Sequence, residues 1–264
     1  MDLQLSDKTA FISGSTAGIG YAIAAGLAKE GATVIINSRK QERVDEAIAQ
    51  LQSEEISGKV SGIAADLSTA AGAAKVIEQF PSVDILINNV GIYEPKPFEE
   101  ITDDEWLNFY QVNVMSGVRL SRAYLSGMKQ RNWGRIIFIS SESGVHIPGP
   151  MVHYGMTKAA QIAIARGLAE TTAGTAVTVN SVLAGPTYSE GVSEFVEQMA
   201  DSQGKDTEAV EAEFFKETRP TSLIQRFAAP EEVASLVVYV ASPLSAATNG
   251  APLRVEGGCI RAAF

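Results

Sequence analysis

The sequence predicts a single α/β domain in which a seven-stranded parallel sheet is flanked by helices on both faces. Short β-branched apolar runs alternate with longer amphipathic segments along all 264 residues, an order typical of a doubly wound sheet with right-handed crossovers. Runs such as Val34-Ile35-Ile36 and Ile136-Ile137-Phe138-Ile139 are apolar on successive residues, as in strands buried on both faces. Because no linker or internal repeat divides the chain, we expect residues 1–264 to form one domain.

The elements follow one another in a regular order. The expected strands are Thr9–Ser13, Thr33–Asn37, Lys59–Ala64, Ile85–Asn88, Arg135–Ser140, Ala176–Val182 and Pro252–Val255. The expected helices are Gly18–Glu30, Gln41–Glu54, Ala70–Gln79, Asp103–Lys129, Tyr154–Thr172 and Glu231–Ala241. Two of the helix starts carry recognisable signals. Thr102 and Glu105 have the spacing of a capping box, and Pro230 is a residue that a first turn tolerates.

Residues 190–219 depart from this order. The segment holds nine acidic residues against three basic ones, and so carries −6 of the total charge of −10. We expect a helical acidic insertion here. It is either a solvated helix pair that packs on the body through Phe195, Val196, Phe214 and Phe215, or a mobile lid over a substrate pocket, since long excursions lie at the carboxyl ends of strands.

The composition excludes several classes of partner. With 21 Lys and Arg against 31 Asp and Glu, the chain is expected to bind neither nucleic acid nor an anionic membrane surface. Cys259 is the only cysteine, and no cluster of Cys and His predicts a metal site. Residues 1–8 contain no apolar core of a signal peptide, and no apolar run is long enough to span a bilayer. We therefore expect a cytoplasmic protein.

A glycine-rich turn follows the first strand directly, in Gly14-Ser15-Thr16-Ala17-Gly18-Ile19-Gly20. Glycines allow a tight turn and a close approach to a ligand, and the start of the next helix presents unpaired N–H groups to a phosphate. The spacing is G-x3-G-x-G, which differs from the usual dinucleotide fingerprint. The turn predicts a site for the pyrophosphate of a nucleotide cofactor.

The end of the second strand indicates which cofactor binds. The strand ends in Asn37-Ser38-Arg39-Lys40, without the carboxylate that would bond the 2′-hydroxyl of NAD. Arg39 offers a planar fork suited to a 2′-phosphate, and Ser38 offers a hydroxyl. We expect NADP(H) to be preferred, with NAD(H) possible. In the alternative interpretation, Arg39 and Lys40 begin a solvated loop and Asn37 holds the ribose.

A tyrosine and a lysine begin a later helix. Tyr154 and Lys158 are four residues apart and share a helix face. A close ammonium is expected to lower the pKa of the tyrosine hydroxyl from its usual value near 10, which suits proton exchange. Ser141 ends the fifth strand thirteen residues earlier, and Asn113 is a polar residue inside the apolar stretch of the Asp103–Lys129 helix.

Together these motifs resemble the short-chain dehydrogenase/reductase family, over essentially the whole chain and in the same order. The resemblance implies a Rossmann fold and a catalytic tetrad of Asn113, Ser141, Tyr154 and Lys158. It also implies contacts with NADP(H) or NAD(H) from Gly14, Ser15, Thr16, Gly18, Ile19, Gly20, Ser38, Arg39, Asp66, Leu67, Asn89, Gly91, Tyr154, Lys158, Gly185 and Thr187.

The resemblance further implies a function. Ser141 would bond the substrate oxygen, Tyr154 would donate the proton as the nicotinamide delivers hydride, and Lys158 would bond the nicotinamide ribose. Asn113 would hold a water that relays protons, no metal would be needed, and the protein would be a homotetramer or homodimer.

The substrate is less constrained than the reaction. An acidic insertion disfavours an acidic carrier protein, so we expect a small ketone or secondary alcohol. The alternatives are a reductase of 3-oxoacyl thioesters on acyl carrier protein and a non-catalytic nucleotide-binding regulator. Tyr93, His146 and His153 either line the substrate pocket or serve as ordinary packing.

Overall fold

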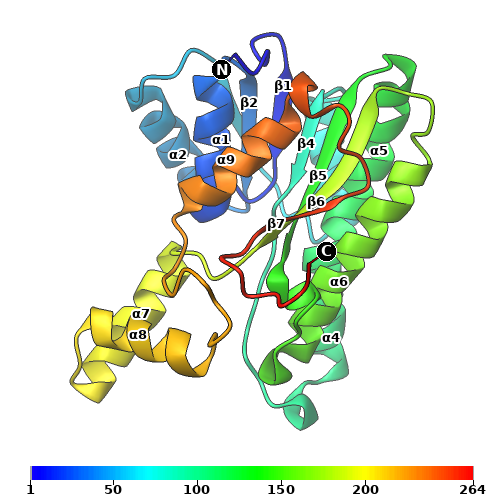
Figure 1. The fold of residues 1–264 in the computed structure, drawn as a ribbon. Coiled ribbons are helices and arrows are strands. Elements are labelled where there is room, and N and C mark those ends of the chain that lie inside the picture. The colour runs from blue at the N-terminus through cyan, green and yellow to red at the C-terminus, as the bar shows by residue number, and fades with distance from the viewer. Residues whose placement is uncertain (1, 264) are drawn as a thin grey trace.

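Seven parallel strands form the centre of the fold, in the order β3-β2-β1-β4-β5-β6-β7 (Figure 1). The structure is a computed structural model that describes residues 2–263, and the side chains of all of these except positions 190, 191, 194, 195, 198 and 203. The strands are β1 (Thr9–Ile12), β2 (Thr33–Ser38), β3 (Val60–Ala64), β4 (Ile85–Asn88), β5 (Gly134–Ser141), β6 (Val177–Ala184) and β7 (Pro252–Val255). The predicted doubly wound sheet is therefore confirmed.

Helices cover both faces of the sheet. They are α1 (Gly18–Lys29), α2 (Gln41–Ser53), α3 (Ala70–Gln79), α4 (Asp103–Tyr110), α5 (Ser116–Gln130), α6 (Val152–Glu170), α7 (Glu190–Gln203), α8 (Thr207–Glu217) and α9 (Pro230–Ala241). The capping box at the start of α4 is confirmed, because the Thr102 side chain accepts from the Glu105 backbone while the Glu105 carboxylate accepts from the Thr102 backbone.

Successive strand residues face opposite layers. Ile12 and Ile36 pack in one apolar core with the helices α1, α2 and α9. Their neighbours Phe11 and Ile35 pack in a second core with α3, α5 and α6. This two-sided burial explains why the strands read as unbroken apolar runs in the sequence.

One prediction was wrong in its boundaries. The stretch expected to be one helix, Asp103–Lys129, is divided into α4 and α5 by a π-helical turn over Gln111–Met115. Such a turn places one extra residue within the helix and occurs mostly at functional sites. Here it turns the buried side chain of Asn113 towards the segment after β4, where that side chain bonds both backbone groups of Ile92.

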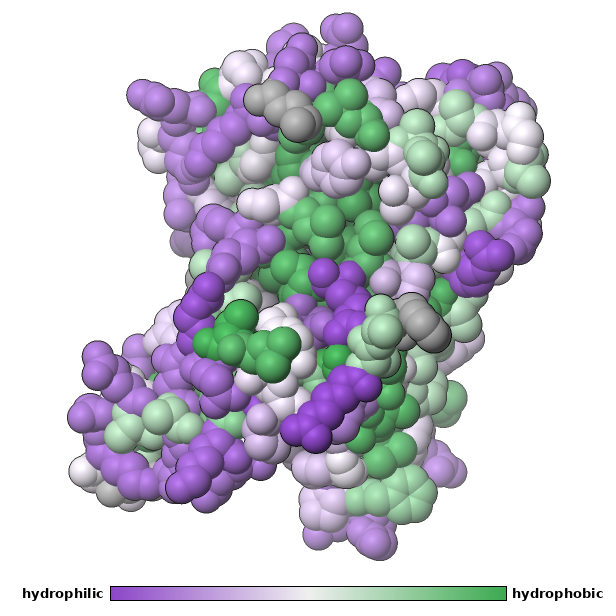
Figure 2. Space-filling view, in the orientation of Figure 1, coloured by the Kyte–Doolittle hydropathy of each residue, from purple (hydrophilic) through white to green (hydrophobic). Residues whose placement is uncertain are grey.

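The acidic insertion forms a helix pair with an apolar core of its own. Helices α7 and α8 lie to one side of the sheet (Figure 1), and Figure 2 shows a mostly hydrophilic outer surface over them. Val196 and Phe215 pack with Phe227 in this small core and belong to neither core of the sheet. Phe227 lies outside residues 190–219, so these two residues, together with Phe214, contact the rest of the chain at Phe227 and not at the sheet. Phe195, which was assigned the same role, has a side chain outside the described residues.

Within residues 2–263, none of the helices combines the length and the apolar character that crossing a bilayer requires.

Candidate active site

The candidate site lies where the strand order reverses. β1 pairs with β2 on one side and with β4 on the other, and in parallel sheets ligands bind outside the carboxyl ends of strands at such a switch point. The glycine-rich turn follows β1, Asn89 follows β4, and Ser141 is the last residue of β5. The topology thus brings the glycine-rich turn, which is predicted to bind the cofactor, and the predicted catalytic residue Ser141 to the same edge of the sheet.

The glycine-rich turn depends on its glycines for conformation and for space. Gly14 and Gly18 have φ angles of +60° and +53°, which side chains rarely adopt. A Cβ on Gly20 would lie 2.3 Å from the Gly14 carbonyl oxygen and 2.5 Å from Asn89 Nδ2. Helix α1 then begins without a side-chain cap, so its first N–H groups remain available to an anion.

Neighbouring side chains hold this turn in place. Asn89 Nδ2 donates to the carbonyl oxygens of Ser13 (3.1 Å) and Gly14 (2.8 Å). The Ser15 hydroxyl donates to the Ile12 carbonyl at 2.6 Å and accepts from the Asn37 backbone at 3.0 Å. Asn89 and Ser15 therefore shape the turn. Thr16 and Ile19 lie partly exposed on it.

The end of β2 separates the two interpretations of the ribose site. Asn37 is only 1% exposed, and its amide donates to the carbonyls of Ile63 and Ala65, both at 3.1 Å. Its Oδ1 accepts from Gly14 N at 3.3 Å. Because this side chain is already engaged on all sides, it is unsuited to holding a ribose. Ser38 is half-buried and Arg39 is exposed, where a phosphate group can reach them.

Three further segments border the same edge. After β3, the exposed Asp66 carboxylate accepts from the Ser68 backbone and hydroxyl, and Leu67 is buried in the sheet core. After β6, a Cβ on Gly185 would lie 2.6 Å from the Glu256 carbonyl oxygen, and the Thr187 hydroxyl donates to the Gly185 carbonyl. These contacts stabilise the loops, so any contact of Asp66, Leu67, Gly185 or Thr187 with a cofactor remains a prediction.

The structure brings Ser141, Tyr154 and Lys158 together. Lys158 Nζ lies 5.6 Å from the centroid of the Tyr154 ring and donates to the Ile139 carbonyl at 2.8 Å. Ser141 lies near enough to the Tyr154 hydroxyl to lower the pKa of that hydroxyl, and Ser141 Oγ accepts from Ser143 N at 3.1 Å. A Cβ on Gly91 would lie 3.5 Å from Lys158 Nζ and 3.6 Å from Asn113 Oδ1. The space beside Gly91 is thus bordered by the polar atoms of two predicted catalytic residues.

The side chain of Asn113 forms hydrogen bonds with other residues of the protein. Its Oδ1 accepts from Ile92 N at 2.8 Å, and its Nδ2 donates to the Ile92 carbonyl and to Thr157 Oγ1, both at 2.9 Å. Its backbone carbonyl accepts from Gln161 Nε2 at 2.7 Å. Asn113 therefore joins the segment after β4 to helix α6. Sequence reasoning missed Thr157 and Gln161, whose partners lie more than forty positions away in the chain.

Burial dominates the proton affinities of the pair on α6. Burial raises the pKa of Tyr154 to about 12, and the hydrogen bond with Ser141 lowers it in part. Burial also lowers the pKa of Lys158 to about 8. This direction is opposite to the expectation for Tyr154, because desolvation raises the pKa more than the Ser141 hydrogen bond and Arg219 lower it, and Glu142 raises it further. At neutral pH the phenol is protonated, which is the state that a proton donor requires.

The flanking aromatic residues have different roles. Tyr93 is half exposed, and its ring lies edge-on to Tyr154 with centroids 6.3 Å apart, so it borders the site. His153 is buried between Trp106 and Phe109 at ring distances of 5.9 and 4.1 Å, and burial lowers its pKa. His146 is exposed. For His153, the packing interpretation holds.

A buried ion pair beside the site was not predicted. Arg219, from the segment after α8, bonds Glu142 Oε1 through Nε at 3.0 Å. Glu142 directly follows Ser141. The partners are 77 positions apart, and only the composition of the insertion drew attention to Arg219.

Three comparisons place the chain among known proteins. The family model described as short chain dehydrogenase matches residues 8–200. Two uncharacterized oxidoreductases of Bacillus subtilis (strain 168) are similar over the full length: YvaG is 47% identical over 100% of both chains, and YvrD is 50% identical over 99% of both chains. The structure of L-sorbose reductase from Gluconobacter frateurii, complexed with NADPH and L-sorbose, is similar with a TM-score of 0.92, at 31% identity over 99% of this chain and 100% of that one.

Replacing Gly20 tests the shape of the turn. Because a methyl group there would contact Gly14 and Asn89 at 2.5 Å or less, we expect Gly20→Ala to weaken NADPH binding by about tenfold or more. Fluorescence titration with NADPH measures the change. Gly167→Ala is the matched control, since a Cβ at that position meets nothing within 4 Å. Equal affinities for the two variants would contradict a phosphate site at this turn.

Proposed function

The chain belongs to the short-chain dehydrogenase family, and on that basis we propose that it is an NADP(H)-dependent oxidoreductase that interconverts a small ketone and the corresponding secondary alcohol. The observation that carries this proposal is the proximity of Ser141, Tyr154 and Lys158, with Lys158 Nζ next to Gly91, at the same edge of the sheet as the glycine-rich turn.

The residues present fit a dinucleotide. The uncapped start of α1 and the turn Gly14–Gly20 suit a pyrophosphate, while Asp66, Leu67, Asn89, Gly91, Gly185 and Thr187 border the same edge. When bound, the cofactor supplies or accepts the hydride. The NADPH in the similar L-sorbose reductase structure supports this assignment.

The chain's own residues handle the substrate oxygen and its proton. In reduction, Ser141 donates a hydrogen bond to the carbonyl oxygen, and the protonated Tyr154 transfers its proton to that oxygen as the carbon receives hydride. Lys158, largely cationic at neutral pH with a pKa of about 8, would stabilise the phenolate that remains and would hold the ribose of a bound nicotinamide cofactor. Asn113 holds the segment after β4 against α6.

Charge supports NADP(H) over NAD(H). Ser38 and the exposed Arg39 stand at the end of β2, where an NAD site would present a carboxylate. With the Asn37 amide committed to Ile63 and Ala65, Arg39 and Ser38 are the groups suited to a 2′-phosphate.

The surroundings of the site favour a small substrate of little charge. The acidic insertion contacts the site region through Arg219 and Glu142, and the half-exposed Tyr93 lies edge-on to Tyr154. The negative charge of the insertion disfavours polyanions and an acidic carrier protein. The L-sorbose in the similar reductase is a neutral ketose of this kind. We infer that α7–α8 serve as the substrate lid.

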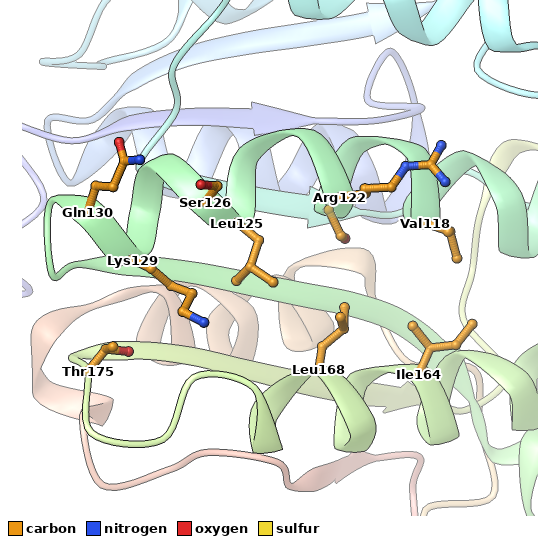
Figure 3. Close-up of a pocket in the computed structure, with 10 residues that line it drawn as sticks. Val118, Arg122, Leu125, Ser126, Lys129, Gln130, Ile164, Leu168 and Thr175 are labelled. Atoms are coloured by element: carbon orange, nitrogen blue, oxygen red, sulfur yellow. The ribbon is translucent and has the colours of Figure 1, made fainter.

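We also infer that the protein assembles as a homotetramer, or as a homodimer, through the outer face of α5 and α6. A groove lies between these helices, remote from Tyr154, and Figure 3 shows Leu125, Ile164 and Leu168 pointing into it. These apolar side chains are half-buried. A second copy packed on this face would cover them.

The tyrosine tests the function directly. Tyr154→Phe removes the proton donor, so we expect turnover with NADPH and a responsive ketone to fall by about a thousandfold or more while NADPH still binds. A panel of ketones, hydroxyketones and acetoacetyl thioesters, followed by NADPH absorbance, supplies the substrate. Turnover near that of the wild type would rule out this mechanism, and exclusive use of the thioester would favour the acyl reductase.

The cofactor preference is tested at Arg39. We expect Arg39→Asp to raise the KM for NADPH far more than the KM for NADH, because the new carboxylate repels the 2′-phosphate and can bond a 2′-hydroxyl. Lys216→Asp, which makes the same charge change on exposed α8, serves as the control and should alter both constants equally. Equal effects of Arg39→Asp on the two cofactors would show that Arg39 does not contact the phosphate.

The interface is tested by placing a charge in the groove. We expect Leu125→Glu to shift the protein to smaller species in sedimentation velocity, since a buried unpaired carboxylate opposes association. Circular dichroism should show an intact fold. Unchanged sedimentation of a multimeric wild type would place the interface elsewhere.

A further inference from the structure

We propose that Glu142 and Arg219 are a positioning pair beside Ser141 and Tyr154, so that the acidic insertion supplies a charge on which the catalytic chemistry depends. The proposal rests on the function proposed above and concerns the same site. It assigns a role to a carboxylate and a guanidinium that the tetrad does not include.

The pair is buried where the insertion meets the catalytic strand. Arg219 Nε lies 3.0 Å from Glu142 Oε1, with side chains 13% and 3% exposed. The Ser143 hydroxyl donates to the same oxygen at 3.1 Å. Among the described residues, Glu142 Oε2 has no hydrogen-bond partner. The guanidinium of Arg219 is therefore the main compensation for a buried negative charge.

Arg219 is held in place by its own segment. Its backbone N–H donates to the Phe214 carbonyl at 3.1 Å, and its carbonyl accepts from Ser222 N at 3.0 Å. Its Nη1 donates to the Thr218 carbonyl at 3.0 Å. The next residues are tied to the C-terminal segment, since the Thr221 hydroxyl donates to the Cys259 carbonyl at 2.7 Å. The charge thus has a fixed position relative to Glu142.

Ser143 links the pair to the site, because its backbone N–H donates to Ser141 Oγ at 3.1 Å while its hydroxyl donates to Glu142 Oε1. The two partners also act on the Tyr154 hydroxyl with opposite sign. Glu142 raises the pKa of Tyr154 and Arg219 lowers it. The other groups facing this hydroxyl are Ser141 from β5, whose hydrogen bond lowers the pKa, and Tyr93 from the segment after β4, which raises it. Lys158 lies on the same helix.

One further titratable group faces Glu142. Burial, together with Glu142 and Glu256, raises the pKa of the Cys259 thiol to about 11, so the thiol is neutral in the working range of pH. The charge of Glu142 at the site is therefore compensated chiefly by Arg219.

An effect of the pair on the pKa of Tyr154 leads to a prediction that differs from that of a purely structural contact. If the pair only fastened the insertion, loss of either partner would impair the site in the same way. If the pair sets the proton affinity, Arg219→Met leaves a bare carboxylate beside Tyr154, whereas Glu142→Gln leaves a bare guanidinium. The two variants should then shift the tyrosine titration in opposite directions.

The titration is measured by fluorine NMR with a fluorotyrosine incorporated at the position of Tyr154, in the NADPH-bound protein. Fluorine makes the phenol more acidic, which brings the titration into a range where the protein stays folded. We expect Arg219→Met to raise the apparent pKa by about one pH unit, a tenfold change in the dissociation constant, and Glu142→Gln to lower it by a similar amount. The double variant should titrate near the wild type.

Two further variants complete the experiment. Arg219→Lys keeps the charge and should titrate near the wild type, which gives a test even if the Met variant unfolds. Arg226→Met is the matched control, because it removes the exposed pair of Arg226 with Glu232 near the same insertion and should produce no shift. Thermal unfolding shows which variants are folded.

Shifts of the same sign for Arg219→Met and Glu142→Gln would overturn the proposal, as would the absence of a shift in both or a shifted Arg219→Lys. The readout requires no turnover. If the wild type binds NADPH and the shifts are opposite, yet no carbonyl compound is reduced, the proposed function fails while the positioning pair stands. If ketones are reduced and the shifts are absent, only the pair fails.

Discussion

The parallel pairing of β1 with β4 is the constraint on which the rest of the structure depends. It places the glycine-rich turn after β1 directly against Asn89, whose amide bonds the Ser13 and Gly14 carbonyls. Only glycine fits at position 20 because the Gly14 carbonyl and the Asn89 amide occupy the space of a side chain. The same pairing leads the segment after β4 past Gly91 to Ile92, where Asn113 holds it.

The site combines buried polar groups that are matched by specific partners. Burying a polar group without a hydrogen bond is costly. Asn37 bonds backbone groups of Gly14, Ile63 and Ala65. Asn89 bonds the turn after β1, and Asn113 bonds the backbone of Ile92 and the side chain of Thr157. These amides fix the relative positions of strand ends that are distant in sequence. Tyr154 and Lys158, the proposed reactive pair, lie beside these segments, and burial raises the pKa of Tyr154 and lowers the pKa of Lys158.

The acidic insertion is connected to the rest of the site by an ion pair as well as by the polypeptide chain. Its helices bury Val196 and Phe215 with Phe227 in a core separate from those of the sheet. Arg219, from the segment after α8, reaches Glu142, the residue beside Ser141. The position of the insertion therefore sets the electrostatic environment next to Ser141.

The sequence by itself determined the features that depend on local chemistry. Strand runs such as Val34-Ile35-Ile36, the turn glycines and the four-residue spacing of Tyr154 and Lys158 follow from periodicity and backbone preference, and they predicted the fold and the family. Contacts between distant residues decided the rest. The π-helical turn at Asn113, the packing of His153, the commitment of Asn37 and the pair of Glu142 with Arg219 leave no local pattern, since their partners come from other elements. The pKa of Tyr154 rises because of burial, and only the folded chain determines what is buried.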